Sequence, residues 1–477
     1  MKKILLVDDD KNLSRSLANL FDSQDFNFDF LEDGSEVKKI IASNSKYDLV
    51  MLDVNLPTIS GLEVLKEIKK VNKTIPVIVI SGFVSTENAI QAIREGAFEY
   101  LTKPFELKKL VATVNRACGL TAQPAEAPAV SHTNQVSSKT IGEMIGKAPE
   151  IVEIAKMVGQ LSKSKAPVLI VGEQGTGKEL VARAIHRNSL LSSNQFLSIN
   201  CASMPESLLE SELFGHEKGA FTGAYYKRIG KIEQANQGTL FLADIGKASM
   251  LTQSKLLRVL QEGKFERVGG EESIDVDTRL IVSSSGSLVE AMKEGSFRVD
   301  LFYKLKVASI YIPPLRDRRN DIPLLVDYFL EKYSAKESEN PKRISKEAMQ
   351  YLSGYDWPGN IRELENNVQS AVMMGRADIL TLEDFPAYTE RNTTNGKKTL
   401  EIKSDYTDSF KNIIEPVMPK LILNSPGQIY QFLESAFERA IISSCLKLFN
   451  GNQVKTSESL GISRNTLRDR ISRYDLY

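Results

Sequence analysis

The sequence predicts a multidomain α/β protein, in which two domains with parallel sheets are followed by a small all-α domain. Short unbroken apolar runs near the N-terminus each end in polar residues, as buried parallel strands do. A later run of this kind leads into a glycine-rich loop that ends at Lys178. Near the C-terminus, two short helical patterns are joined by Gly461-Ile462, which is the spacing of a helix-turn-helix.

Length and composition agree with several soluble domains. The chain has 477 residues, which is too long for one core, and its 61 basic residues equal its 61 acidic residues. Any nucleic-acid binding must therefore come from a local basic patch. No apolar stretch is long enough to span a bilayer, so we expect a cytoplasmic protein with no membrane partner. The 3 cysteines lie far apart and indicate neither a disulfide framework nor structural zinc.

Two stretches without periodic apolar spacing divide the chain. Residues 119–140 concentrate Pro, Ala, Ser and Thr, and residues 388–426 contain a polar segment followed by a Pro-interrupted one. We read both as linkers. The sequence therefore predicts an N-terminal domain over 1–118, a middle domain over 141–387 and a C-terminal domain over 427–477.

The N-terminal domain is predicted to be a doubly wound parallel sheet. Strands are expected at 4–7, 49–52 and 76–80, with an amphipathic helix marked by apolar residues between 13 and 21. Such sheets bind ligands beyond the carboxyl ends of their strands. The residues that fall there are Asp8, Asp9, Asp53, Ser81 and Lys103. One such acid is usually only solvated, but three crowded carboxylates call for a hard cation such as Mg²⁺.

These residues give the segment a close resemblance to the response-regulator receiver domain over its whole length. The resemblance implies that Asp8, Asp9, Asp53 and the carbonyl of Asn55 hold Mg²⁺, and that Asp53 accepts a phosphoryl group from a histidine kinase. It further implies that Ser81 and Lys103 contact the phosphoryl oxygens, that Tyr100 is the switch aromatic, and that Lys103-Pro104 is a candidate cis peptide.

The first functional motif of the middle domain is a phosphate loop. A predicted strand at 168–171 runs into Gly172-Glu173-Gln174-Gly175-Thr176-Gly177-Lys178-Glu179. Glycines let backbone N–H groups converge on phosphate oxygens, and Lys178 adds a positive charge at a helix N-terminus. Glu179 stands where the general pattern has a hydroxyl for magnesium.

From about Ile141 to Pro386 the chain resembles the AAA+ domain of sigma-54 activators, whose form of the phosphate loop includes the glutamate at Glu179. The resemblance implies a P-loop α/β domain with a helical lid, ATP binding by the loop and the sensor arginine Arg362, and assembly into a ring. It also implies that Gly219-Ala220-Phe221-Thr222-Gly223-Ala224 is the loop that engages sigma-54 RNA polymerase.

The hydrolytic residues depart from that family. Where the family has Asp-Glu, this chain has Ala243-Asp244, and an alanine cannot organise magnesium. Ser285 replaces the sensor asparagine, and Lys304 replaces the second of two arginines that reach a neighbouring subunit. Asn200 and the first of those arginines, Arg298, are retained. We therefore expect nucleotide binding and leave hydrolysis open.

The C-terminal domain is predicted to read DNA. An apolar-periodic helix from Ile429 precedes two helices at 455–460 and 463–474, and most of the basic residues lie on the last helix. The segment resembles the Fis-type helix-turn-helix of the same activator family. The resemblance implies base contacts from Ser463, Arg464, Asn465 and Thr466, phosphate contacts from Arg468 and Arg470, and dimerisation through the first helix.

Two functional hypotheses therefore remain. The first is a two-component response regulator that activates sigma-54-dependent transcription from promoter or enhancer DNA, as a dimer that assembles a ring on activation. The second is a phosphorylation-gated DNA-binding regulator whose ring binds ATP without consuming it, and Ala243 favours it. A ring remodeller outside transcription is disfavoured by the helix-turn-helix. The sequence leaves open whether phosphorylation activates or relieves repression.

Overall fold

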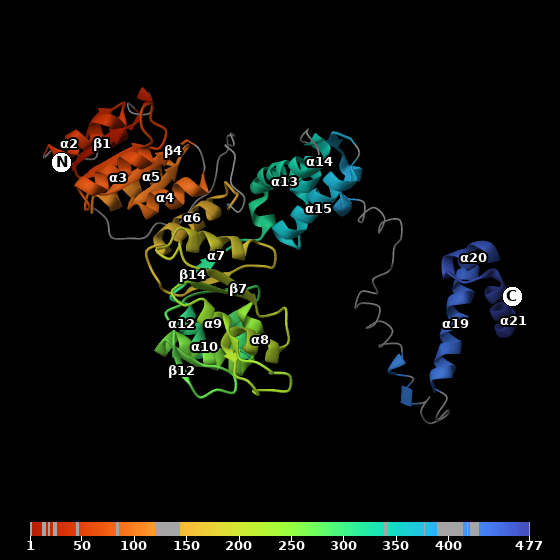
Figure 1. Cartoon of the computed structure of the whole chain (residues 1–477). Coiled ribbons are helices and arrows are strands. Elements are labelled where there is room, and N and C mark those ends of the chain that lie inside the picture. Colours follow the sequence, from red (N-terminus) through yellow and green to blue (C-terminus); the bar gives the residue numbers. More distant parts are fainter. Residues whose placement is uncertain are drawn as a thin grey trace. The chain divides into compact units, whose positions relative to one another are not determined.

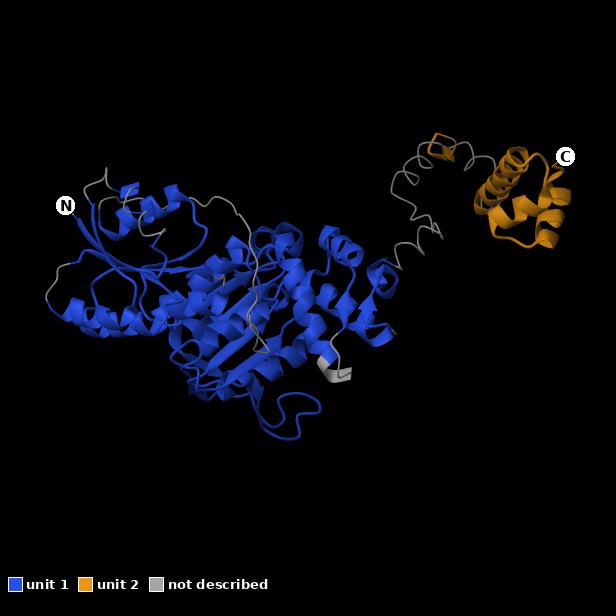
Figure 2. Cartoon of the chain, turned by 90° about the horizontal axis from the view of Figure 1, so that it is seen from above, with its two compact units in different colours: residues 1–390 blue, residues 391–477 orange. Residues whose placement is uncertain are grey.

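The computed structural model divides the chain into two compact units, 1–390 and 391–477 (Figure 2). It describes residues 2–11, 16–17, 20–21, 26–43, 47–82, 85–119, 144–337, 342–375, 377–388, 414–416, 418–419 and 429–476. The two predicted linkers and part of the helix expected between 13 and 21 lie mostly outside these residues. Among the described helices, none combines the length and apolar character needed to cross a bilayer.

The N-terminal domain is a five-stranded parallel sheet in the order β2-β1-β3-β4-β5 (Figure 1). Its strands are β1 (Lys2–Val7), β2 (Phe26–Leu31), β3 (Leu49–Asp53), β4 (Val77–Ser81) and β5 (Glu99–Thr102). Its described helices are α2 (Val37–Ala42), α3 (Gly61–Val71), α4 (Thr86–Arg94) and α5 (Leu107–Ala117). Strands β3 and β4 are buried along their whole length, because helices cover both faces of the sheet. The predicted doubly wound sheet is confirmed.

The middle domain has a second five-stranded parallel sheet, in the order β14-β6-β13-β10-β7. Its strands are β6 (Val168–Val171), β7 (Phe196–Asn200), β10 (Thr239–Ala243), β13 (Arg279–Ser284) and β14 (Ala308–Tyr311). The helices around it are α6 (Pro149–Leu161), α7 (Lys178–Arg187), α8 (Glu206–Phe214), α9 (Lys231–Gln234), α10 (Met250–Glu262), α11 (Leu288–Lys293) and α12 (Val299–Leu305). Two small antiparallel pairs, β8 (Gly215–His216) with β9 (Arg228–Ile229) and β11 (Lys264–Glu266) with β12 (Ser273–Asp275), support loops at its surface.

A helical lid follows, as the resemblance implied. It consists of α13 (Ile322–Glu337), α14 (Lys346–Gly354) and α15 (Asn360–Met374), with a short parallel pair of β15 (Arg343–Ile344) and β16 (Ile379–Leu380). Trp357 is fully buried in the core of the lid, and its indole N–H donates to the carbonyl oxygen of Leu352 at 2.8 Å. This hydrogen bond satisfies the one polar atom of the side chain, as burial requires.

The second unit contains the predicted helix-turn-helix. Its helices are α19 (Ile429–Leu448), α20 (Gln453–Leu460) and α21 (Arg464–Tyr474). Ser463 caps α21 by accepting a hydrogen bond from the backbone N–H of Thr466 at 3.1 Å. Gly461 ends α20 with a φ of 66°, a left-handed conformation that favours glycine. A small core of Ile442, Leu467 and Ile471 joins α19 to α21, and Leu460 of α20 packs against it.

Candidate functional site

The N-terminal domain gathers its acidic residues at one edge of its sheet. Carboxylate oxygens of Asp8, Asp9 and Asp53 all lie within 4.8 Å of one another. Asp8 and Asp53 are buried, whereas Asp9 is exposed. Lys103 donates to Asp8 at 2.7 Å and to Asp53 at 2.5 Å, so that its ammonium group offsets two of the three charges. The cluster predicted from the strand ends is therefore formed.

Asp53 is held in a partly desolvated position. Burial raises the pKa of its carboxyl group, while hydrogen bonds from Lys103 and from the backbone N–H of Asn55 oppose that rise. The Asn55 N–H donates to Asp53 Oδ1 at 2.8 Å, which holds Asn55 next to the cluster. The three carboxylates are oxygen donors, which fit Mg²⁺, and the Asn55 carbonyl would add a fourth oxygen.

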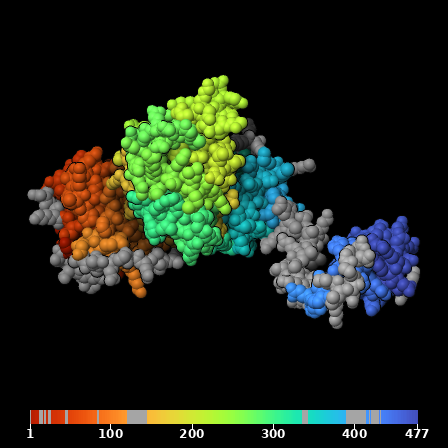
Figure 3. All heavy atoms as spheres, turned by 90° about the horizontal axis from the view of Figure 1, so that it is seen from below, coloured from red at the N-terminus to blue at the C-terminus, as the bar shows by residue number. Residues whose placement is uncertain are grey.

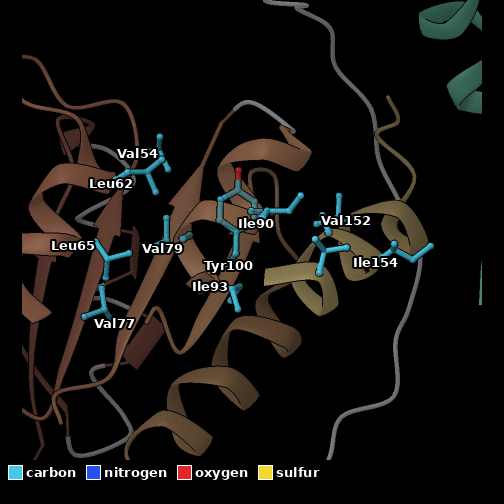
Figure 4. Packing of buried hydrophobic residues seen from close by; sticks show 14 of the residues in the cluster. Val54, Leu62, Leu65, Val77, Val79, Ile90, Ile93, Tyr100, Val152 and Ile154 are labelled. Carbon is cyan, nitrogen blue, oxygen red and sulfur yellow. The ribbon is translucent and has the colours of Figure 1, made fainter. Parts of the chain in front are cut away.

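Tyr100 and Ser81 lie next to this cluster on adjacent strands. Tyr100 is 1% exposed and packs within the hydrophobic cluster under α4 (Figure 4). Burial raises the pKa of its hydroxyl group, and the hydroxyl forms a hydrogen bond with the side chain of Ser81. The Lys103–Pro104 peptide bond is cis, so that prediction is confirmed.

The phosphate loop lies between β6 and α7. Gly175 and Gly177 have φ angles of 79° and 101°, so both need the left-handed conformation that glycine tolerates. A Cβ at Gly175 would lie 2.1 Å from the carbonyl oxygen of Gly359, because the lid passes directly over the loop. Lys178 donates to the carbonyl oxygens of Gly172 and Glu173 at 2.7 and 2.8 Å. Burial lowers the pKa of Lys178.

The lid contributes groups that the sequence patterns did not single out. Arg316 forms two hydrogen bonds to the Glu173 carboxylate, at 2.5 and 2.8 Å, and Asn360 donates to the same carboxylate at 3.2 Å. Together they lower the pKa of Glu173 to about 2. The predicted sensor Arg362 lines an open hollow of about 590 Å³ together with Gln174, Gly175, Gly359, Glu363 and Asn366.

The end of β10 lies at the same edge of the parallel sheet as the end of β6, where the phosphate loop begins. Asp244 raises the pKa of Lys178 by its negative charge, and Arg362 lowers that pKa by its positive charge. Asp244 has a φ of 53°, and its Oδ1 is buried without a hydrogen-bond partner in the described part of the chain. Ala243 pairs with Asn200 on the adjacent strand β7, which places that retained residue at the same sheet edge.

Among the described residues, no hydrogen bond or ion pair joins three other predicted positions to the phosphate loop. Arg298 forms two hydrogen bonds to Asp300, at 2.6 and 3.0 Å. Lys304 lies on α12 and is exposed. Ser285 follows β13 and is also exposed.

The predicted sigma-54 loop is the tip between β8 and β9. Gly219 donates its N–H to the carbonyl oxygen of Ala224 at 2.8 Å, which closes the tip, and Thr222 is exposed. Phe221 is 47% exposed and packs edge-on against His216 with ring centroids 5.0 Å apart. The surface around this segment, yellow-green in Figure 3, projects from the first unit. Tyr225 and Tyr226, which the sequence patterns did not single out, follow at 75% and 83% exposure.

The helix-turn-helix presents most of its predicted contact residues to solvent. Ser463, Arg464, Asn465, Thr466 and Arg468 are all exposed at the beginning of α21. Arg470 differs, because it pairs with Glu438 of α19 at 3.1 Å. The hydroxyl of Tyr474 donates to the same carboxylate at 2.6 Å. In this structure Arg470 therefore also joins α21 to α19.

Comparisons with known proteins cover all these sites. Residues 4–115 match the response regulator receiver domain, 144–311 the sigma-54 interaction domain, 316–401 the AAA+ ATPase lid domain, and 435–474 the bacterial regulatory proteins of the Fis family. The regulatory protein AtoC of Escherichia coli (strain K12) is 39% identical over 100% of this chain and 98% of its own length. The DNA-binding transcriptional regulator NtrC of the same organism is 35% identical over 98% of each chain.

Solved structures give the same picture. NtrX from Brucella abortus in complex with ATP aligns with a TM-score of 0.51 at 29% identity, over 99% of this chain and 100% of its own. The complex of the same protein with ADP aligns with a TM-score of 0.52 at 28% identity, over 99% and 100%. Receiver, AAA+ and helix-turn-helix domains thus follow one another here as they do in full-length relatives. The chain belongs to the NtrC-like family of sigma-54-dependent response regulators.

Proposed function

We propose that phosphorylation of Asp53 controls how this regulator acts on sigma-54 RNA polymerase at promoter or enhancer DNA. The observation that carries the proposal is the cluster of Asp8, Asp9 and Asp53 with Lys103 beside it. That arrangement supplies a nucleophile, a site for a hard cation and a positive charge for phosphoryl oxygens. Ser81 lies at the end of the neighbouring strand and would contact the same oxygens.

In the proposed reaction, a carboxylate oxygen of Asp53 forms a bond to phosphorus as the phosphorus–nitrogen bond of a phosphohistidine donor breaks. The carboxylates of Asp8, Asp9 and Asp53 and the Asn55 carbonyl would hold Mg²⁺, which offsets the charge that develops on the phosphoryl oxygens. Lys103 would turn from the carboxylates toward the new phosphoryl group. The imidazole of the donor histidine leaves with the electron pair of that bond, and it leaves as a neutral ring because its other nitrogen carries a proton.

We propose that the signal leaves through Tyr100. Ser81 bonds to Tyr100 in this state, and a phosphoryl group on Asp53 would compete for the Ser81 hydroxyl. Tyr100 packs in the hydrophobic cluster that also contains α4 and α6. A change there would loosen the contact between the receiver and AAA+ domains, so phosphorylation would relieve a restraint.

We propose that ATP binds at the phosphate loop. Gly172, Glu173, Gln174, Gly175, Thr176, Gly177, Lys178 and Glu179 would contribute the loop, and Arg362 would reach in from the lid. Arg298 and Lys304 would face the nucleotide of a neighbouring copy in a ring. Asn200 and Asp244 remain to orient water, and Asp244 is one methylene shorter than the family's glutamate.

A second candidate function is favoured by Ala243. With a methyl group at the end of β10, no carboxylate is available there to organise hydrated Mg²⁺. Ser285 and Lys304 weaken the same site further. The ring would then bind ATP as a ligand and turn it over slowly or not at all, while phosphorylation and DNA binding are retained.

The sigma-54 contact would be made by the tip from Gly219 to Ala224, with Phe221 and Thr222 as its presented side chains. Phe221 packs against the His216 ring in this structure, and this contact would break when the tip changes conformation. The tip is anchored at its base, where Arg267 donates to Glu217 at 2.9 Å.

For DNA, Ser463, Arg464, Asn465 and Thr466 would contact base edges and Arg468 a phosphate. Arg470 pairs with Glu438 through Nη1, and its other N–H groups would contact a phosphate. The apolar residues Tyr430, Phe432, Phe437 and Ile441 are exposed on α19, which supports pairing of two copies on a two-fold site.

Acetyl phosphate with Mg²⁺ provides the direct test. The full chain is expected to gain one phosphoryl group by intact mass, and Asp53→Asn is expected to gain none, because an amide does not act as the acceptor. Asp48→Asn, which replaces a carboxylate on the same domain that pairs with Lys2, is the control and should label normally. Equal labelling of wild type and Asp53→Asn would sink the proposal.

A further inference from the structure

The receiver and AAA+ domains share one continuous core. Helix α6 packs along α4, so that Val152 faces Ile90 and Ile93 across the boundary (Figure 4). Gly159 lies at the closest approach, where a Cβ would be 2.7 Å from the carbonyl oxygen of Ile90 and 3.0 Å from the Ile93 side chain. The contact therefore leaves no room for even one added methyl group.

A buried ion pair crosses the same boundary. Lys156 of α6 is 6% exposed and donates to Glu99 of β5 at 2.6 Å. Arg116 of α5 donates to the other oxygen of Glu99 at 2.8 Å. Burial alone raises the pKa of Glu99, but Lys156 and Arg116 hold it below its usual range. Separation of the domains would break the Lys156 contact, and Glu99 is directly followed by the switch residue Tyr100.

From this boundary, hydrogen bonds lead to the segment that precedes α6. Thr86, the first residue of α4, donates to the carbonyl oxygen of Met144 at 2.6 Å. A few residues later, the backbone N–H groups of Lys147 and Ala148 donate to Asp321 Oδ1 at 2.6 and 2.9 Å. The start of α6 is thus held by the receiver on one side and by a lid carboxylate on the other.

The chain of contacts ends at the phosphate loop. Arg318 lies 4.0 Å from Asp321 and donates to the carbonyl oxygen of Thr176, inside the loop, at 3.1 Å. Asp321 Oδ2 and Arg318 Nε are buried with no hydrogen-bond partner among the described residues. A buried pair that is only partly satisfied is sensitive to small shifts of its neighbours. Movement of residues 144–148 would therefore shift Asp321 and Arg318, and with them the hydrogen bond to the Thr176 carbonyl.

We infer that docking of the receiver on α6 and nucleotide binding at the phosphate loop are thermodynamically linked. The docked receiver orders residues 144–148 and so holds the Asp321–Arg318–Thr176 contacts in place for nucleotide. By reciprocity, bound nucleotide strengthens docking and opposes release of the receiver. The inference rests on the proposed ATP binding, and it gives the nucleotide a regulatory role that needs no turnover.

The variant Gly159→Ala should weaken docking of the receiver without weakening the fold of the AAA+ domain. The added methyl meets only receiver atoms, and alanine favours a helix more than glycine does, so the AAA+ domain itself is not weakened. The dissociation constant of mant-ATP with Mg²⁺, measured on the full chain, is expected to rise about fivefold or more. Glu99→Lys, which opposes Lys156 and Arg116 from the receiver side, should weaken binding in the same direction.

Gly354→Ala is the matched control, because a Cβ at that lid glycine meets nothing within 4 Å. It should bind mant-ATP like the wild type. If the wild type binds but both docking variants match it within about twofold, or bind more tightly, the linkage is wrong. If the wild type itself fails to bind mant-ATP, the proposed ATP binding falls first, and the linkage falls with it.

Discussion

Replacing Ala243-Asp244 by Asp-Glu is expected to raise steady-state ATP turnover of the full chain by about 10²-fold or more. Ala243 is the last residue of β10 and Asp244 follows it, and the charge of Asp244 raises the pKa of Lys178, so we expect the restored carboxylates to lie near the phosphates that Lys178 binds. The first would organise Mg²⁺, and the second would gain the methylene that Asp244 lacks. Release of inorganic phosphate, measured on wild type and on the double variant Ala243→Asp/Asp244→Glu, checks this result.

The change must act through the nucleotide site. Adding Lys178→Ala to the double variant should return turnover to background, since the same loop binds the substrate. The single variant Ala243→Asp should fall between wild type and the double variant. Rapid ATP turnover by the wild type, or no gain in turnover in the double variant, would contradict the view that Ala243 and Asp244 limit hydrolysis.

Lys178→Ala in the otherwise native chain is expected to weaken mant-ATP binding by about 10²-fold. Lys178 is poised in the loop by the Gly172 and Glu173 carbonyls, and loss of its charge-assisted contact to a phosphate costs about 3 kcal/mol. Lys165→Ala is the matched control, because Lys165 pairs with Asp277 at the surface of the same domain. Equal affinity for Lys178→Ala and wild type would exclude this loop as the nucleotide site.

The receiver cluster could be predicted because strand ends are set by local pattern. Each apolar run is followed directly by its polar residues, so parallel pairing of β1, β3 and β4 brings them to one edge. The cap of α21 is equally local, because Ser463 and Thr466 are only three positions apart. Sequence spacing decides such features without knowledge of the distant chain.

Contacts between distant segments could not be predicted in the same way. Glu173 and Arg316, or Glu99 and Lys156, are far apart in the sequence, and nothing local selects one charged partner among many. The same holds for the ion pair of Arg470 with Glu438, which belong to different helices. Gly159 gave no signal either, because its role depends on Ile90 of another domain.

The contacts between distant segments connect the receiver domain to the AAA+ domain. The receiver contacts α6 through Glu99 and the segment before α6 through Thr86, and the same segment donates to Asp321. Modification at Asp53 must therefore change the exposure of α6 if it controls the AAA+ domain at all.

Hydrogen–deuterium exchange across residues 149–161 of the full chain tests this claim most directly. Treatment with acetyl phosphate and Mg²⁺ is predicted to speed exchange in this helix in wild type and to leave Asp53→Asn unchanged, because only the former releases the receiver. Unchanged exchange in wild type that intact mass shows to be phosphorylated would contradict the account.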